Sequence, residues 1–143
     1  MFDINSDRDI NVKAIDFFSA YSGSGPVEVY VRSGSYVGFE FESSGWNLAY
    51  SQTITYYGLD QTARLDSLNN GEGIFVPQGS TVGVFMFASD MLRYQNPDAL
   101  ISVEEIRDNS IKVMDGTGLN YENKWAGTAD NKFSPRLFRG SLV

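Results

Sequence analysis

The chain of 143 residues contains neither cysteine nor histidine. Without cysteine, no disulfide can form and no thiol can act as a nucleophile or a metal ligand. Without histidine, Ser-His-Asp and Cys-His nucleophile systems are excluded, and so are zinc sites built on imidazole. These two absences remove most hydrolase mechanisms. A disulfide is also not required, because a domain of this length buries roughly two thirds of its unfolded surface.

Basic residues are scarce, with 11 Lys and Arg against 18 Asp and Glu and a net charge of -7. Such a surface repels phosphate backbones and anionic lipid headgroups, so we expect no nucleic-acid partner. No run approaches the roughly 18 apolar residues of a transmembrane helix, so we expect no membrane insertion. Residues 1–20 lack the pattern of a signal peptide. If the natural protein is exported, we expect that this chain was cut from it.

The longest apolar stretch runs from Ile74 to Ala88 and is rich in Val and Phe. This composition is typical of strands that are buried on both faces. Pro77 has no backbone N–H to donate, and Gly79 can adopt a positive φ. The stretch therefore predicts one strand that ends at Val76, a bend, and a second strand that begins near Thr81.

Most of the remaining chain shows strand patterns separated by turn residues. Ser22–Pro26 predicts a loop, and Asn69–Gly73 predicts a turn with left-handed backbone. Pro97–Arg107 is the one helix candidate, although its apolar residues also alternate as in a strand. Further strands are predicted over residues 1–4, 10–18 with a bulge near Ala14, 27–32, 36–41, 46–57, 63–68, 110–114 and 133–143.

Many short strands with at most one short helix indicate an all-β fold. We predict a single antiparallel β-sandwich domain over residues 1–143, similar to a jelly roll. Both ends of the chain have strand patterns, and such topologies often place the first and last strands side by side. We therefore expect the C-terminal strand beside the N-terminal region, with Phe133, Leu137 and Leu142 covering the core.

Several short motifs are spread over almost the whole chain: Met1-Phe2-Asp3-Ile4 followed by Asp9-Ile10, Val27-Glu28-Val29-Tyr30 with Gly34-Ser35-Tyr36-Val37-Gly38-Phe39-Glu40, Val76-Pro77-Gln78-Gly79, and Phe133-Ser134-Pro135-Arg136. In this order they resemble an uncharacterised β-sandwich module of large exported or surface proteins of marine bacteria and diatoms. The resemblance implies a domain of a larger exported protein, located outside the cell or at its surface. It implies no catalytic residues.

Three aspartates, Asp3, Asp7 and Asp9, flank the first predicted turn. Calcium takes six to eight oxygen ligands from carboxylates and loop carbonyls of this kind. The alternative is that Asp7 and Asp9 only end a loop and solvate the edge of a strand. We favour the alternative, because the sequence contains neither an EF-hand loop nor a repeated calcium motif. We therefore expect no cofactor. The other interpretation is that calcium binds at these aspartates.

Aromatic residues outside the predicted core are candidates for ligand binding. Tyr121 and Trp125 lie in the longest polar loop, and Tyr30 and Tyr57 point away from the predicted core. Sugar-binding sandwich domains commonly stack a pyranose ring on such a side chain. The alternative for Trp125, which we favour, is packing onto the sandwich, since buried aromatics are commoner. Trp46 shares a face with Leu48 and Ile54, which predicts a core position.

Two functions from different classes remain. The first is a non-catalytic recognition or adhesion module that binds a glycan or surface ligand through loops at one end of the sandwich. The second is a structural unit that joins copies of itself by pairing of strand edges. A glycosidase would need two carboxylates at a defined separation in a cleft, and nothing in the sequence points to such a pair. We therefore expect no enzymatic activity.

Overall fold

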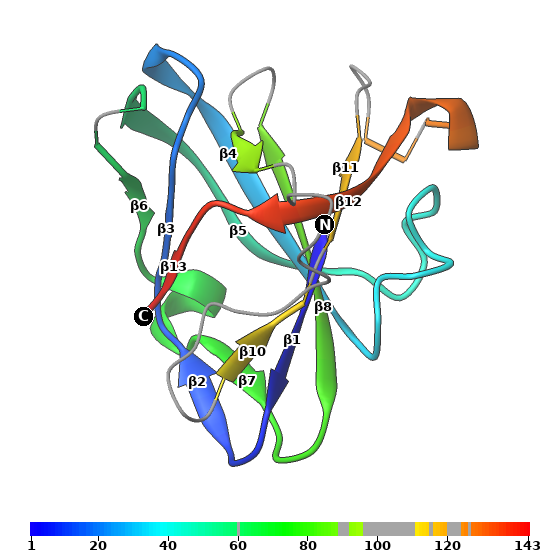
Figure 1. Cartoon of the computed structure of the whole chain (residues 1–143). Helices are drawn as coiled ribbons and strands as arrows, with labels where there is room; N and C mark the ends of the chain where they lie inside the picture. The colour runs from blue at the N-terminus through cyan, green and yellow to red at the C-terminus, as the bar shows by residue number, and fades with distance from the viewer. Residues whose placement is uncertain (60, 89–91, 96–110, 115, 120–123, 126) are drawn as a thin grey trace.

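The computed structural model describes residues 1–59, 61–88, 92–95, 111–114, 116–119, 124–125 and 127–143 (Figure 1). These residues form antiparallel β-sheets, which confirms the predicted all-β, sandwich-like fold. The described part contains two short 3-10 turns, η1 (Leu68–Gly71) and η2 (Ala129–Asn131). The predicted helix over residues 97–107 lies outside the described residues. No helix in the described ranges has the length and apolarity needed to cross a membrane.

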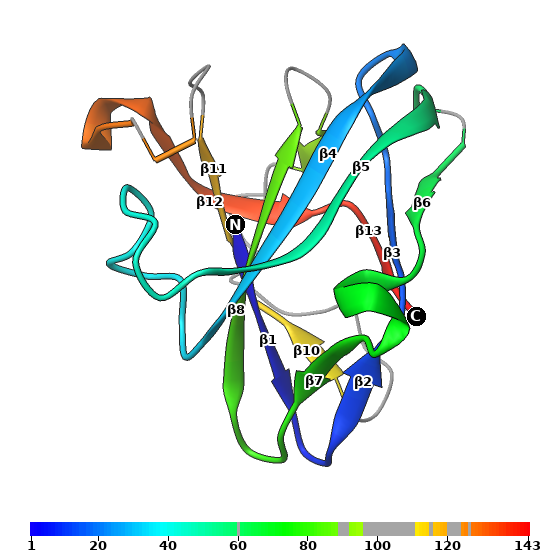
Figure 2. The same ribbon diagram turned by 180° about the vertical axis from the view of Figure 1, so that it is seen from behind.

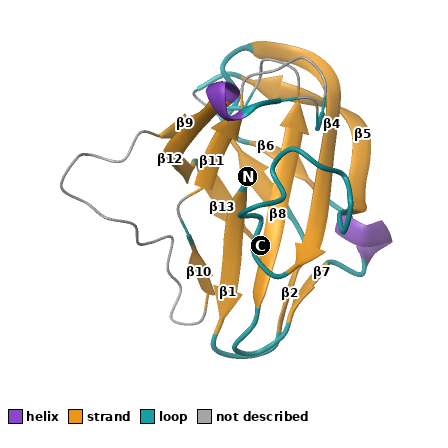
Figure 3. Ribbon diagram, turned by 90° about the vertical axis from the view of Figure 1, so that its right-hand side faces the viewer, coloured by secondary structure: helices purple, strands orange, loops and turns teal. Residues whose placement is uncertain are grey.

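One layer of the structure is a five-stranded sheet in the order β10-β1-β8-β4-β5. In Figure 3, β1, β8, β4 and β5 lie side by side. The strands are β1 (Phe2–Ser6), β4 (Ser22–Ser33), β5 (Asn47–Tyr57), β8 (Thr81–Ala88) and β10 (Ile111–Val113). β8 lies between β1 and β4, and all its residues from Val82 to Met86 are buried. The prediction of a strand covered on both faces is therefore confirmed.

Smaller sheets cover one face of this layer. In Figures 1 and 2, β12 and β13 lie on the opposite side of the structure from β4 and β5. The sheets are β13 (Gly140–Leu142) with β3 (Ile15–Phe17) and β6 (Ala63–Leu65), β2 (Ile10–Val12) with β7 (Ile74–Val76), and β11 (Gly116–Leu119) with β12 (Lys132–Phe138) and β9 (Tyr94–Gln95). The side chains of Ile4, Phe17, Val29, Leu65 and Val84 are fully buried between the layers. The other face of the five-stranded sheet, which carries Phe85, is called the outer face here.

Two turns follow the prediction from local chemistry. Strand β7 ends at Val76, Gly79 has a φ of 70°, and β8 begins at Thr81. The N–H of Gly79 donates to the carbonyl of Ser6, at 2.8 Å. Residues 69–71 all have positive φ, as predicted for the Asn-Asn-Gly turn. The strand that precedes this turn is confirmed as β6, with a shorter span than predicted.

The N-terminal strand pattern contains the predicted irregularity. The chain leaves its partner β7 after Val12 and joins β13 and β6 from Ile15 onwards. The N–H groups of Lys13 and Ala14 both donate to the carbonyl oxygen of Val143. Two neighbouring donors on one acceptor disrupt the ladder in the manner of a bulge. This irregularity lets one stretch of chain contribute strands to two sheets.

The C-terminal strand pairs beside the N-terminal region, as predicted. β13 lies antiparallel to β3, with Leu142 opposite Ile15. The residues that cover the core differ from the prediction, because Phe133 is 38% exposed and Phe138 stacks on Phe2 with ring centroids 4.6 Å apart. Phe138 and Leu142 pack against the core, whereas Phe133 and Leu137 do not belong to it.

The predicted loop at residues 22–26 is wrong, because these residues form the first part of β4. They pair with the second half of β5, with Gly23 opposite Tyr56. A Cβ atom at Gly23 would lie 3.1 Å from the Tyr56 ring, so glycine permits this close packing. Pro26 precedes the point where β4 begins to pair with β8, at Val27. There β4 has a partner on one side only, where proline is tolerated.

Two further local predictions are wrong. Residues 36–41 form turns instead of a strand, because Gly38 has a φ of 87° and the N–H of Tyr36 donates to the side chain of Asp3. The Asp115-Gly116-Thr117-Gly118 pattern predicts a turn that ends the preceding strand, but residues 116–119 form β11. β11 pairs with β12, and a Cβ at Gly116 would lie 1.9 Å from the carbonyl of Met1. Glycine is therefore required at Gly116 for close backbone packing rather than for a turn.

Strand β5 does not alternate regularly. Its register against β4 shifts between Val29 and Tyr30, where Ala49 is the extra residue. As a result Ala49 and Tyr50 are both buried, whereas Leu48 is 54% exposed. The predicted core position of Trp46 is also wrong. Its side chain is partly buried on the outer face, with its ring centroid 6.0 Å from that of Phe85.

Candidate functional site

Two of the predicted ligand-binding residues, Tyr30 and Trp125, pack against each other on the outer face. Their rings meet edge-on with the centroids 5.4 Å apart. Phe85 lies 4.7 Å from Trp125, and Trp46 lies 5.7 Å from it, again measured between centroids. We call Tyr30, Trp46, Phe85 and Trp125 the outer aromatic cluster. Tyr30 and Trp125 are both partly buried there, in contact with protein rings.

Lys124, the residue before Trp125, forms hydrogen bonds with side chains of strand β4. The ammonium group of Lys124 donates to the carboxylate of Glu28 and to the hydroxyl oxygen of Tyr30, the latter at 2.7 Å. Burial acts to lower the pKa of Lys124, but the bonds to Glu28 and Tyr30 outweigh it and raise the pKa. The charged form of Lys124 therefore helps to hold Trp125 over Phe85.

The three aspartates considered as calcium ligands have different surroundings. The carboxylate of Asp3 is buried and accepts hydrogen bonds from the Ser35 hydroxyl at 2.6 Å and the Tyr36 N–H at 3.0 Å. Asp9 accepts a bond from the N–H of Gln78, and Asp7 is exposed. The described residues contain no group of three or more acidic side chains that could hold a metal ion. In this structure the carboxylate of Asp3 therefore holds the loop at residues 35–36 by accepting these two hydrogen bonds.

The remaining aromatic candidates are Tyr57 and Tyr121. Tyr121 lies outside the described residues. The side chain of Tyr57 is 46% exposed, at the end of β5, and it lines an open groove of about 500 Å³. The groove is lined by Tyr50, Gln52, Ile54, Thr55, Tyr57, Gln61, Thr62, Arg64, Asp66 and Ser67. We call it the β5–β6 groove.

The groove exists because β5 and β6 belong to different sheets. β5 is the last strand of the five-stranded sheet, and β6 is the last strand of the sheet formed with β3 and β13. The two strands follow each other in sequence and lie near each other in Figure 2, yet they share no ladder. Side chains from both strands therefore border the space between two sheet edges.

Most groups that line the β5–β6 groove are neutral and polar. Apart from Ile54, Arg64 and Asp66, every lining residue carries a hydroxyl or an amide group. Tyr50 is buried, and its hydroxyl donates to the Gln52 side chain at 3.4 Å. Burial and, less strongly, the charge of Asp66 raise the pKa of Tyr50, so its phenol stays protonated. Such groups can both donate and accept hydrogen bonds.

The charged groups of the groove are paired with each other. The Nε atom of Arg64 donates to Asp66 at 2.8 Å, and its Nη1 atom lies 3.6 Å from the carboxylate of Asp16. Asp16 also accepts a hydrogen bond from the hydroxyl of Ser141. Among the described residues, Arg64 supplies the one guanidinium group that lines the groove, and this group is shared between two carboxylates.

Sequence reasoning identified Tyr57 but missed the other lining residues. A signal was present, since Thr62, Arg64 and Asp66 alternate with the buried residues Ala63 and Leu65. This alternation places the three polar side chains on one face of a short strand. The position of that face opposite β5 depends on the pairing of β6 with β3, which no local pattern indicates.

Comparisons of the chain with protein-family models, with curated proteins and with solved structures found no match.

Proposed function

We propose that this chain is a non-catalytic glycan-binding module and that the β5–β6 groove is its binding site. The observation that carries the proposal is the exposed ring of Tyr57 beside a groove lined mainly by hydroxyl and amide groups. An extracellular or cell-surface location, as part of a larger exported protein, belongs to the same proposal.

The chemistry of sugars fits this combination. A pyranose has an apolar C–H face, which an aromatic ring can cover, and hydroxyl groups that donate and accept hydrogen bonds. Tyrosine offers an apolar ring face together with a polar hydroxyl. Gln52, Thr62 and Ser67 supply neutral polar groups that match hydroxyl groups without a net charge. A small number of such groups fixes the orientation of a ligand in a site.

A glycan array followed by calorimetric titration tests the proposal. Tyr57→Ala removes the exposed ring, and we expect it to weaken glycan binding at least tenfold. Phe75→Ala is the matched control, because Phe75 is 55% exposed and does not line the groove. The control variant should bind as the parent does. The proposal is wrong if no glycan binds, or if Tyr57→Ala binds as tightly as the parent.

A second candidate function is self-association through the edge of β5. This strand is the last of its sheet, and none of its residues from Asn47 to Tyr57 is charged. Natural proteins usually protect edge strands with charges or proline. Sedimentation velocity over a range of concentrations tests this function, and Thr53→Lys should prevent any oligomer by placing a charge at the exposed edge. A chain that stays monomeric at high concentration rules it out.

A further inference from the structure

We infer that the ligand of the β5–β6 groove is an uncharged oligosaccharide that extends beyond the groove onto Tyr21. This inference rests on the proposed function and adds the class of ligand and a second contact. It is carried by two independent features of the described residues: the paired charges in the groove and the exposed side chain of Tyr21, whose backbone lies beside the end of β5.

The charge of the groove disfavours anionic sugars. Recognition of a carboxylate or sulfate group requires free cationic donors, for which arginine is the usual residue. Arg64 is the cation that lines the groove, and its guanidinium contacts both Asp66 and Asp16. The side chain of Asp66 is 69% exposed, so an anionic sugar would meet a carboxylate at the same place. The net charge of -7 adds long-range repulsion.

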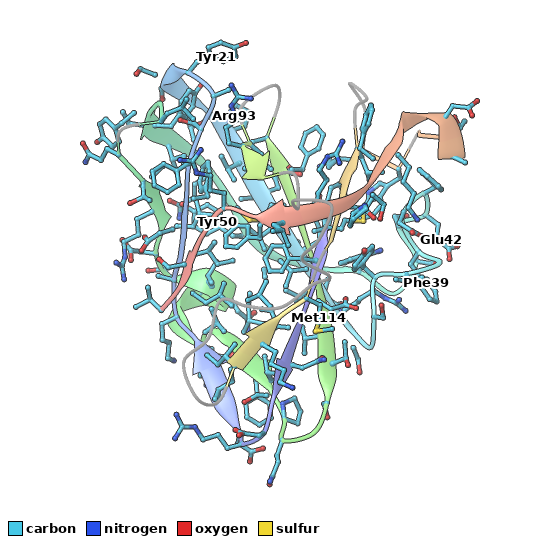
Figure 4. The ribbon with its side chains drawn as sticks, viewed as in Figure 1. Tyr21, Phe39, Glu42, Tyr50, Arg93 and Met114 are labelled. Atoms are coloured by element: carbon cyan, nitrogen blue, oxygen red, sulfur yellow. The ribbon has the colours of Figure 1, made fainter. Side chains whose placement is uncertain are left out.

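Tyr21 stands next to the groove. Ser22 pairs with Tyr57 across β4 and β5, so Tyr21 is adjacent to Gly58 on the neighbouring strand. A Cβ at Gly58 would lie 3.9 Å from the backbone carbon of Tyr21. The side chain of Tyr21 is 66% exposed and projects from the end of the molecule in Figure 4, whereas Tyr50 lies within it. Leu59, the second residue after Tyr57, is also exposed, at 43%.

The backbone that carries these side chains is held by one buried hydroxyl group. Ser19 is fully buried, and its hydroxyl donates to the carbonyl of Tyr21 at 2.8 Å. The same oxygen accepts a hydrogen bond from the N–H of Gly58 at 3.0 Å. Ser19 thus fixes the backbone beside both Tyr21 and Tyr57. An exposed ring on a fixed backbone loses less conformational freedom when a ligand binds, which favours binding.

Titration of the full chain with saccharides of defined length and charge tests the inference. The neutral probes are the hexasaccharides and disaccharides of cellulose, xylan and mannan, and the anionic probe is hexagalacturonate. We expect at least one neutral hexasaccharide to bind at least tenfold more tightly than hexagalacturonate. Asp66→Asn should strengthen binding of hexagalacturonate, because it leaves Arg64 with one carboxylate partner instead of two.

Tyr21→Ala tests the second contact. The variant should weaken binding of the neutral hexasaccharide several-fold and leave binding of the matching disaccharide unchanged. Its melting temperature should equal that of the parent, since the side chain is exposed. An unchanged affinity for the hexasaccharide would overturn the contact with Tyr21.

The outcomes separate this inference from the proposed function. Tight binding of hexagalacturonate that is lost in Tyr57→Ala would overturn the inference that the ligand is uncharged. The proposal that the groove binds a glycan would still hold. Failure of every saccharide on the array to bind would overturn both.

Discussion

The ring of Trp125 meets the ring of Phe85 edge-on, with the centroids 4.7 Å apart and an interplanar angle of 73°. Phe85 belongs to the central strand β8 and is only 4% exposed. Trp125 therefore helps to shield the outer face of the sheet from water, with Tyr30 and Trp46 on its other sides. This arrangement gives Trp125 a role in stability, whereas the ring of Tyr57, on which we propose that a glycan binds, stays exposed.

Replacement of Trp125 should therefore lower stability and leave glycan binding unchanged. Trp125→Ala removes a partly buried aromatic side chain, for which we expect a loss of about 2 kcal/mol, below the range for full burial. Urea denaturation gives the free energy of unfolding. Phe75→Ala, at an exposed site, should change it by less than about 0.5 kcal/mol. An unchanged urea midpoint for Trp125→Ala would show that the outer aromatic cluster does not stabilise the fold.

Val84 and Phe85 test the burial of β8 on both faces. Val84 is fully buried on the core side, and Phe85 lies under Trp125 on the outer side. Val84→Ala and Phe85→Ala should each cost about 2–5 kcal/mol, because each leaves a cavity. Thr53→Ala, at an exposed position on β5, is the control. If one of the two core variants unfolds at the same urea concentration as the parent, the corresponding face of β8 is open to water.

Glu40 should make the stability depend on acid pH. Its carboxylate is buried and accepts hydrogen bonds from Lys132 at 2.6 Å and from the N–H of Gly38 at 2.7 Å. Burial acts to raise the pKa of Glu40, but these hydrogen bonds outweigh it and hold the pKa below its ordinary value of 4.5. The stabilisation is therefore present above pH 4.5 and is lost as the pH falls through the lowered pKa.

Glu40→Gln provides the measurement. Between pH 6 and pH 3, the free energy of unfolding should fall more steeply for the parent than for the variant, because glutamine does not titrate. Glu42→Gln is the matched control, since Glu42 is exposed and nearby in sequence. Parallel curves for the parent and Glu40→Gln would mean that the pKa of Glu40 is the same in the folded and unfolded states.

Gly140 should be essential for closure of the sandwich. A Cβ at this position would lie 1.9 Å from the carbonyl oxygen of Asp16, so the pairing of β13 with β3 leaves no space for a side chain. Gly140→Ala should therefore separate the two strands and lower the melting temperature by several degrees. Ser141→Ala, which removes only the hydrogen bond to Asp16, should have a smaller effect. Equal melting temperatures for Gly140→Ala and the parent would show that β13 pairs weakly.

Several features of the fold were predictable from short-range patterns. The bend at Pro77 and Gly79 and the positive φ of Asn69 and Asn70 follow from the conformational preferences of these residue types. The burial of β8 follows from its unbroken apolar composition. Local patterns predicted the wrong backbone structure where a contact distant in sequence determines it. Examples are Gly23, which packs against Tyr56, and Gly116, which packs against the carbonyl of Met1.

The sequence by itself determined that the chain has an all-β fold and no thiol or imidazole chemistry, because composition and alternation act within a few residues. Only the tertiary structure decided which aromatic rings face water. Tyr30, Trp46 and Trp125 come from separate parts of the chain and cover Phe85, whereas Tyr57 stays exposed at the end of β5. It also decided that β6 pairs with β3 instead of β5, which leaves a polar groove between two sheet edges. These outcomes depend on strand pairing over long sequence separations, which local propensity does not encode.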